Sequence, residues 1–224
     1  MDIKTWEAYC EANVTGGYTP GGKPTLIPSS GLALVQFLQR LNILRDHVYI
    51  LDVGCANGRV AIGLDLSNLR YYSYRGLEIV KPAVEFCQRA FHNKPHFHFT
   101  HLDIYNARYW PNGTIKPLNV VYPLDDNTVD VVIANSVYTH VHSYAEAQHY
   151  LDEMQRVLKP GGVLYSTWSF TTLRDQVAIN AKHTIWHINK VLQLLSGLDY
   201  RFLALENDTT PNQAAIVVTK CATS

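Results

Sequence analysis

Residues 50–58 read Ile-Leu-Asp-Val-Gly-Cys-Ala-Asn-Gly, and this stretch decides the fold. Its apolar start predicts a strand, and the residues from Arg59 onward have the apolar spacing of an amphipathic helix. Gly54 permits a sharp turn between the two, and Gly58 lets the loop approach a ligand and the helix pack against the strand. The free N–H groups and the dipole at the start of that helix favour a polar or anionic group, and Asp52 points at the same place.

A dinucleotide site is the main alternative for such a loop, because the fingerprint G-x-G-x-x-G also joins a strand to a helix. The corresponding positions are Gly54, Ala56 and Arg59, so only the first matches. An acid two residues before the first glycine suits a ligand with an ammonium group better than one with a pyrophosphate. The pattern D-x-G-x-x-x-G resembles motif I of class I S-adenosylmethionine (SAM) dependent methyltransferases. That family most often has glycine in place of Ala56, and alanine is expected to fit there if its φ is negative.

Composition indicates an ordinary globular α/β domain. The chain has 224 residues with 47% hydrophobic and 17% charged residues. Its formal net charge is zero, which disfavours binding to long nucleic acid. The four cysteines form no C-x-x-C pair, which indicates a reduced intracellular protein. The start of the chain has no apolar signal region and no run is long enough to span a membrane, so we expect a cytoplasmic protein.

Strand and helix patterns alternate along most of the chain. The stretch 15–28 is rich in glycine and proline and predicts a loop, and the irregular stretch 104–124 interrupts the alternation. The last two strands have no helix between them, so they form a hairpin and one strand is antiparallel. The pattern predicts an α/β fold, a three-layer sandwich around a seven-stranded, mostly parallel Rossmann-like sheet. Strands are expected at about 48–53, 72–78, 97–101, 129–134, 163–168, 201–205 and 214–219, and helices at about 1–14, 30–41, 59–66, 81–92, 144–158 and 184–196.

Polar residues follow the predicted strands, and ligands of open α/β sheets bind beyond the carboxyl ends of strands. Glu78 ends the second strand, where an acid accepts hydrogen bonds from both ribose hydroxyls of a nucleoside, although it also fits an ordinary turn. Asp103 ends the third strand and suits an adenine amino group, with Ile104 packing on the ring; the alternative is a strand-end cap. Asn135 and Ser136 follow the fourth strand, where the methionine part of SAM is expected.

Further segments strengthen the resemblance. Met-Gln-Arg-Val-Leu-Lys-Pro-Gly-Gly-Val-Leu, residues 154–164, resembles the helix-to-strand junction of class I methyltransferases, and the turn at 123–130 resembles theirs before the fourth strand. The whole is similar to small stand-alone bacterial methyltransferases. The resemblance implies a single domain over 1–224, with N-terminal helices and a lid loop in 1–44 and a catalytic core in 45–224. It implies SAM as cofactor and S-adenosylhomocysteine as product. The residues implied for cofactor binding are Tyr18, Asp52, Gly54, Cys55, Ala56, Asn57, Gly58, Glu78, Ile79, Asp103, Ile104, Asn135 and Ser136.

The expected reaction is direct in-line methyl transfer to an oxygen or nitrogen of a small-molecule acceptor, without a membrane partner. A hydroxyl acceptor needs a base with a pKa near neutrality, which suits histidine. His140 is the first candidate and His142 the second, the alternative being that they lie on the rim or cap a helix. His183, Trp186 and His187 are candidates for the acceptor pocket, and Trp186 also fits a core position.

Two other interpretations remain open, and one cluster is set aside. The chain also fits a SAM-binding protein without catalysis, and less well a nicotinamide-dependent oxidoreductase. Histidines gather near the third strand, but no cysteine lies close by in the sequence, so no metal site is predicted. These histidines are His92, His96, His98 and His101.

Overall fold

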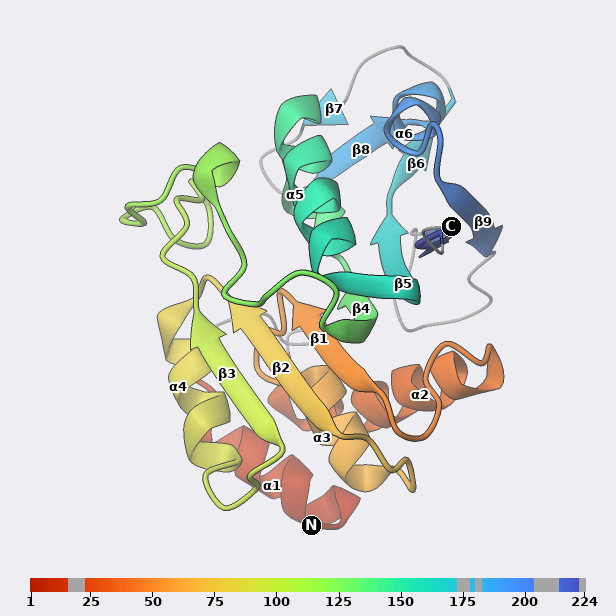
Figure 1. Ribbon diagram of the computed structural model, residues 1–224. Coiled ribbons are helices and arrows are strands. Elements are labelled where there is room, and N and C mark those ends of the chain that lie inside the picture. Colours follow the sequence, from red (N-terminus) through yellow and green to blue (C-terminus); the bar gives the residue numbers. More distant parts are fainter. Residues whose placement is uncertain (16–22, 173–177, 180–182, 204–213, 222–224) are drawn as a thin grey trace. The chain divides into compact units, whose positions relative to one another are not determined.

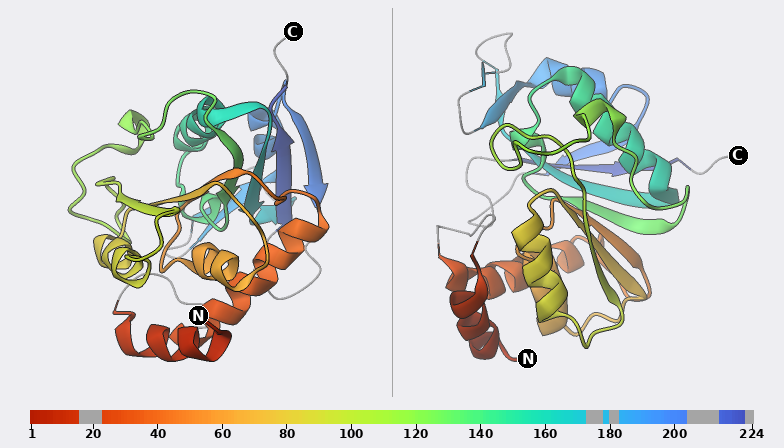
Figure 2. Two further views of the ribbon diagram at one scale, coloured as in Figure 1. Left: turned by 60° about the horizontal axis from the view of Figure 1, so that its bottom comes forward. Right: turned by 90° about the vertical axis from the view of Figure 1, so that its left-hand side faces the viewer.

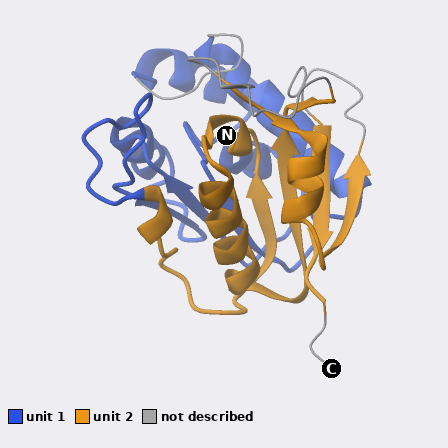
Figure 3. Cartoon of the chain, turned by 90° about the horizontal axis from the view of Figure 1, so that it is seen from above, with its two compact units in different colours: residues 1–116 blue, residues 117–224 orange. Residues whose placement is uncertain are grey.

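The structure is a computed structural model that describes residues 1–15, 23–172, 178–179, 183–203 and 214–221. The chain divides into two compact units, Met1–Lys116 and Pro117–Ser224 (Figure 3). Among the described residues, seven strands belong to the main sheet, three from the first unit and four from the second. A separate sheet of three short strands lies in the second unit.

The first unit has three parallel strands in the order β3-β2-β1 and helices on one face of them (Figures 1 and 2). Trp6 on α1 is fully buried and donates its Nε1 proton to Asp65 on α3 at 2.9 Å, and its ring lies 5.1 Å from that of Phe91. The N-terminal helix is thereby fixed to the core of this unit. The strands are β1 (Tyr49–Val53), β2 (Ser73–Glu78) and β3 (Phe97–His101), and the helices are α1 (Ile3–Asn13), η2 (Pro24–Leu26), α2 (Ile27–Arg40), α3 (Arg59–Leu66) and α4 (Lys81–Ala90).

The second unit has four strands of the main sheet in the order β4-β5-β10-β9. β4 and β5 are parallel, and β10 is antiparallel to both of its neighbours. The expected C-terminal hairpin with one antiparallel strand is therefore confirmed. The strands are β4 (Val129–Ala134), β5 (Leu158–Trp168), β9 (Asp199–Leu203) and β10 (Ala214–Thr219), and the helices are η3 (Pro117–Asn119), η4 (Tyr138–His140), α5 (Tyr144–Val157) and α6 (Ile188–Leu194).

Three local predictions differ from the structure. The helix expected from residue 184 begins at Ile188, because Thr184–His187 form β8, which pairs with β6 (Phe170–Thr171) and β7 (Ala178–Ile179). The predicted loop 15–28 contains a helical turn from Pro24, whose ring favours a helix start. β5 begins at Leu158 and not near 163, because Gly161 and Gly162 exchange backbone hydrogen bonds with Lys220.

Candidate cofactor and acceptor sites

The loop between β1 and α3 makes the turn that its glycines predicted. Gly54 and Gly58 both have φ of 72°, in the left-handed region that glycine enters freely, and Gly58 is the N-cap of α3. The N–H groups of Gly54 and Cys55 both donate to the Leu77 carbonyl, at 2.8 and 3.1 Å. The loop is therefore held against the carboxyl end of β2.

Alanine was expected to fit at position 56 if its φ is negative, and the structure does not meet this condition. The φ of Ala56 is +47°, so this alanine lies in the left-handed region and not at a negative φ. L-residues other than glycine enter this region at a cost, because Cβ crowds the following carbonyl oxygen. The Ala56 N–H donates to Glu78 Oε2 at 2.8 Å, and this bond holds the residue in its conformation.

Glu78 is buried at the end of β2 and accepts three backbone hydrogen bonds. Oε1 accepts from the N–H groups of Ile79 and Val80, both at 2.8 Å, and Oε2 accepts from Ala56. Burial raises the pKa of this carboxyl, and the three N–H bonds oppose that shift. Because a carboxylate oxygen accepts about two hydrogen bonds, Oε2 retains acceptor capacity after binding Ala56.

Asp52 is buried within the strands, and its carboxylate accepts a 2.6 Å hydrogen bond from the Tyr74 hydroxyl on β2. Burial raises its pKa from an ordinary 3.8 to about 7, although the Tyr74 bond and the nearby Arg59 oppose the shift. Tyr74 was not predicted as a partner of Asp52. It is fully buried on β2, between the half-buried Ser73 and the exposed Arg75.

The carboxylate of Asp103 is hydrogen-bonded to the irregular segment that follows it. Oδ1 accepts from Trp110 Nε1 at 2.7 Å, and Oδ2 accepts from the Thr114 hydroxyl and N–H at 2.6 and 3.2 Å. These bonds, led by that of the Thr114 hydroxyl, lower the pKa of Asp103. Ile104 is buried and forms a bridge with Ile115, so residues 103–115 fold back on themselves.

Two buried thiols lie beneath the loop. The thiols of Cys87 on α4 and of Cys55 both donate to the Ala56 carbonyl oxygen, at 3.5 and 3.9 Å. A Cβ on Gly58 would come within 3.0 Å of Cys87 Sγ. Asn57 is also buried here. Cys87 was not predicted, and its spacing on a helical apolar face gives no sign of this contact.

In the second unit, Asn135 and Ser136 follow β4 as expected. Asn135 is only 8% exposed, and neither its Oδ1 nor its Nδ2 has a hydrogen-bond partner among the described residues. Ser136 has φ of +65°, and its N–H donates to Thr167 Oγ1 at 2.7 Å. A buried amide without a partner is costly unless a ligand or water satisfies it.

The predicted histidines come together in pairs with residues at the start of β8. The rings of His140 and His183 lie 5.5 Å apart, centroid to centroid. His142 Nδ1 lies 3.0 Å from the hydroxyl of Thr184, which is fully buried. Thr184 was not predicted, and its sequence position 42 residues away gives no signal of this contact.

The other predicted acceptor residues have structural partners. Trp186 is fully buried and donates its Nε1 proton to the Tyr138 carbonyl at 2.8 Å, which is the core position that the sequence left open. His187 is the N-cap of α6, and its Nδ1 accepts from the Asn189 N–H at 3.2 Å. Tyr18 lies outside the described residues.

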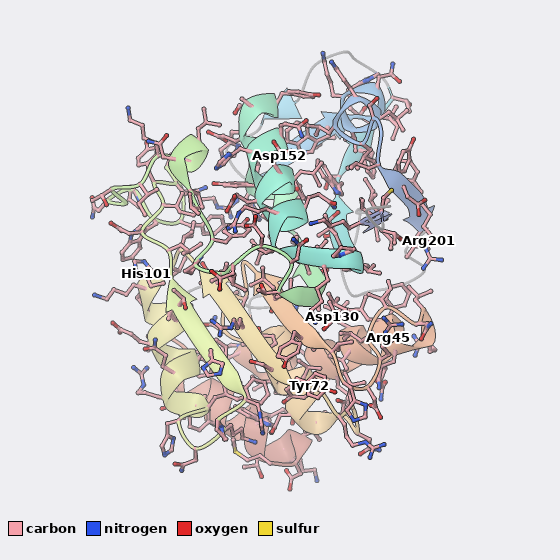
Figure 4. The ribbon with its side chains drawn as sticks, viewed as in Figure 1. Arg45, Tyr72, His101, Asp130, Asp152 and Arg201 are labelled. Carbon is pink, nitrogen blue, oxygen red and sulfur yellow. The ribbon has the colours of Figure 1, made fainter. Side chains whose placement is uncertain are left out.

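The histidines near β3 include one at each end of the strand. His101 lies at the carboxyl end of β3 (Figure 4), with Nε2 2.9 Å from the Ile79 carbonyl oxygen. His96 Nδ1 is 3.2 Å from the Tyr72 carbonyl oxygen at the other end of these strands. Within the described residues, no group of three or more His, Cys, Asp or Glu side chains is arranged to hold a metal ion.

Comparison with known families defines the class of protein. Residues 51–166 match the model of the family described as "Methyltransferase domain", and the chain belongs to this family. Together with its α/β Rossmann-like fold, this makes the chain a member of the class I methyltransferase family, as the motif predicted.

A curated relative is the phthiotriol/phenolphthiotriol dimycocerosates methyltransferase 1 of Mycobacterium ulcerans (strain Agy99). The chain is 31% identical to it over 118 residues, which are 53% of this chain and 36% of that protein. The match thus spans about a third of the relative's length.

Solved structures share the fold. A SAM-dependent methyltransferase of Leishmania major superposes with a TM-score of 0.63 at 17% identity, covering 97% of this chain and 82% of that one. The [4+2]-cyclase SpnF superposes with a TM-score of 0.59 at 17% identity, covering 86% and 82%. Because one of these neighbours is a cyclase, the fold alone does not define the reaction. No helix among the described residues is long and apolar enough to cross a membrane.

Proposed function

We propose that the protein transfers the methyl group of SAM to an oxygen or nitrogen of a small-molecule acceptor. The observation that carries the proposal is the buried Glu78 carboxylate, which holds the motif I loop through Ala56 and retains acceptor capacity on Oε2. This arrangement suits a ribose hydroxyl. The curated relative, itself named as a methyltransferase, supports the reaction class and leaves the acceptor open.

The residues present fit the proposed cofactor. Gly54 is exposed in the turn that precedes α3, and the buried acids Asp52 and Glu78 favour a ligand that carries positive charge. In the second unit, the unpartnered amide of Asn135 is suited to the amino-acid part of SAM. Asp103 has acceptor capacity left on Oδ1 for an adenine amino group.

SAM supplies an activated methyl group on a sulfonium, so the protein contributes mainly position and proton transfer. We propose that Asn135 and Ser136 orient the methionine part, and that a histidine at 140 or 142 takes the proton of a hydroxyl acceptor. His183 contributes to acceptor binding, next to His140.

Calorimetric titration with SAM and S-adenosylhomocysteine tests the cofactor site. We expect micromolar binding that is lost in Glu78→Ala and weakened in Asn135→Ala, with Asn189→Ala as a matched control on α6. Folded variants are verified by circular dichroism. Absence of binding by the folded wild type contradicts the proposal.

A SAM-binding protein without catalysis is the second possibility, because the same fold occurs in a protein that is not named as a methyltransferase, the [4+2]-cyclase SpnF. Production of S-adenosylhomocysteine with a panel of hydroxyl and amine acceptors separates the two. Binding without turnover of any acceptor in the panel favours the second.

A further inference from the structure

The ring and the backbone of His142 are each held by a hydrogen bond. Its ring Nδ1 lies 3.0 Å from Thr184 Oγ1, and its backbone N–H donates to Glu146 Oε2 at 3.2 Å. Glu146 is itself held by the N-cap of α5, because its N–H donates to Ser143 Oγ at 3.2 Å. The backbone and the ring of His142 therefore have separate supports.

Thr184 is a rigid support. It is fully buried at the first position of β8, and β8 is fixed by Trp186, whose N–H donates to the Ser169 carbonyl and whose Nε1 donates to the Tyr138 carbonyl, both at 2.8 Å. The β-branched side chain of threonine has few rotamers, so its hydroxyl stays where the strand places it. His142 itself is an exposed residue.

We propose that Thr184 is a positioning residue that fixes the tautomer of His142, so that His142 Nε2 is the base of the acceptor reaction. This inference rests on the proposed function and assigns the proton transfer to His142, with His140 and His183 as the neighbouring imidazoles. When Nδ1–H donates to Thr184 Oγ1, the lone pair lies on Nε2, because a neutral imidazole carries one proton.

The proposed reaction moves one proton and one methyl group. The acceptor hydroxyl gives its proton to His142 Nε2 while its oxygen bonds to the methyl carbon, and the carbon–sulfur bond breaks with its electron pair left on sulfur. The positive charge moves from the sulfonium to the imidazolium, which keeps its Nδ1–H bond to Thr184. Among the described residues, the titratable groups beside this pair include Glu146, which binds the His142 N–H, and the adjoining imidazoles of His140 and His183.

Long-range ¹H–¹⁵N NMR of the imidazoles tests the inference without any activity. The His142 signals are assigned by their loss in His142→Gln. We expect the Nδ1–H tautomer in the wild type and in Thr184→Ser, and a mixture of tautomers in Thr184→Val, which has nearly the same shape without the hydroxyl. Thr219→Val, on β10, is the matched control and leaves the His142 signals unchanged. An Nε2–H tautomer in the wild type, or unchanged His142 signals in Thr184→Val, overturns the inference.

Kinetics supply the second readout. We expect Thr184→Val to lower kcat by about tenfold or more while the KM for SAM stays unchanged, and Thr184→Ser to restore most of the loss. A Thr184→Val enzyme with wild-type kcat and pH profile overturns the role in proton transfer. Failure of calorimetric SAM binding instead defeats the proposed function, and the NMR result then still decides the positioning of His142.

Discussion

At the scale of the residue, Ala56 is the strained position of the cofactor loop. Its φ of +47° costs an alanine about 1–2 kcal/mol, whereas glycine enters the region freely. Glycine also has more freedom in the unfolded chain, which offsets part of the gain. The loop therefore combines a strained residue with a hydrogen bond from that residue to Glu78.

We expect Ala56→Gly to raise the free energy of unfolding by about 0.5–1 kcal/mol, measured by urea denaturation. Ala61→Gly is the control, because Ala61 lies inside α3, where glycine costs about 1 kcal/mol. A destabilised Ala56→Gly variant would contradict the interpretation of strain.

Asp52 predicts a dependence of stability on pH. Its pKa of about 7 in the folded protein lies above the ordinary 3.8, so protonation favours the folded state. The contribution to stability is fully present below about pH 4 and is lost as the pH rises to about 7, with a slope of up to about 1.4 kcal/mol per pH unit.

Because asparagine does not ionise, we expect Asp52→Asn to flatten this slope and to be more stable than the wild type at pH 8. Chemical denaturation from pH 4 to 8 measures it. Asp46→Asn is the control with the opposite sign, since hydrogen bonds from Arg70 lower the pKa of Asp46 and its contribution is lost as the pH falls. An Asp52→Asn variant that is less stable at pH 8 rules the explanation out.

At the scale of the element, Asp103 holds the segment 103–115 in its fold. We expect Asp103→Asn, which replaces an ionised acceptor with an amide, to weaken the bonds from Trp110 and Thr114 and to expose the segment. Trypsin cleavage after Arg108 should become several-fold faster, with a small change in Tm. Asp125→Asn, in the turn before β4, is the control. Unchanged cleavage would show that other contacts hold the segment.

Substitution of Trp186 distinguishes a core role from an acceptor-pocket role for this residue of β8. Trp186→Phe removes the Nε1–H bond to Tyr138 and part of a buried ring, so we expect a loss of about 1–3 kcal/mol in unfolding free energy. Trp110→Phe, on the partly exposed segment 103–115, is the control for loss of an indole. Unchanged stability with a raised KM for the acceptor would instead place Trp186 in the pocket.

At the scale of the whole molecule, a ligand that binds only the folded chain stabilises it. We expect S-adenosylhomocysteine at 100 times its Kd to add about 2.7 kcal/mol and to raise Tm, whereas NAD at the same concentration does not. EDTA should leave Tm unchanged, since the described residues offer no metal site. A shift with NAD alone would revive the oxidoreductase interpretation.

Local patterns predicted most elements, because strand and helix periodicities are properties of neighbouring residues. The bounds of α3 and β4 agree with the prediction from the apolar spacing. β8 was missed because Thr184-Ile-Trp-His is stabilised by pairing with β6 and by the bonds of Trp186, which are contacts distant in sequence. The segment from 104 onward was correctly predicted as irregular, but not its attachment to Asp103.

The sequence by itself determined the turn at Gly54 and Gly58, the order along the chain of the seven strands of the main sheet, and the resemblance that identified the family. These depend on residue type and spacing along the chain. The tertiary structure alone decided that Glu78 binds Ala56, that Asp103 binds Trp110 and Thr114, and that Thr184 meets His142. These contacts depend on how separate elements pack, because a hydrogen bond needs donor and acceptor within about 3 Å, and only the folded chain sets that distance.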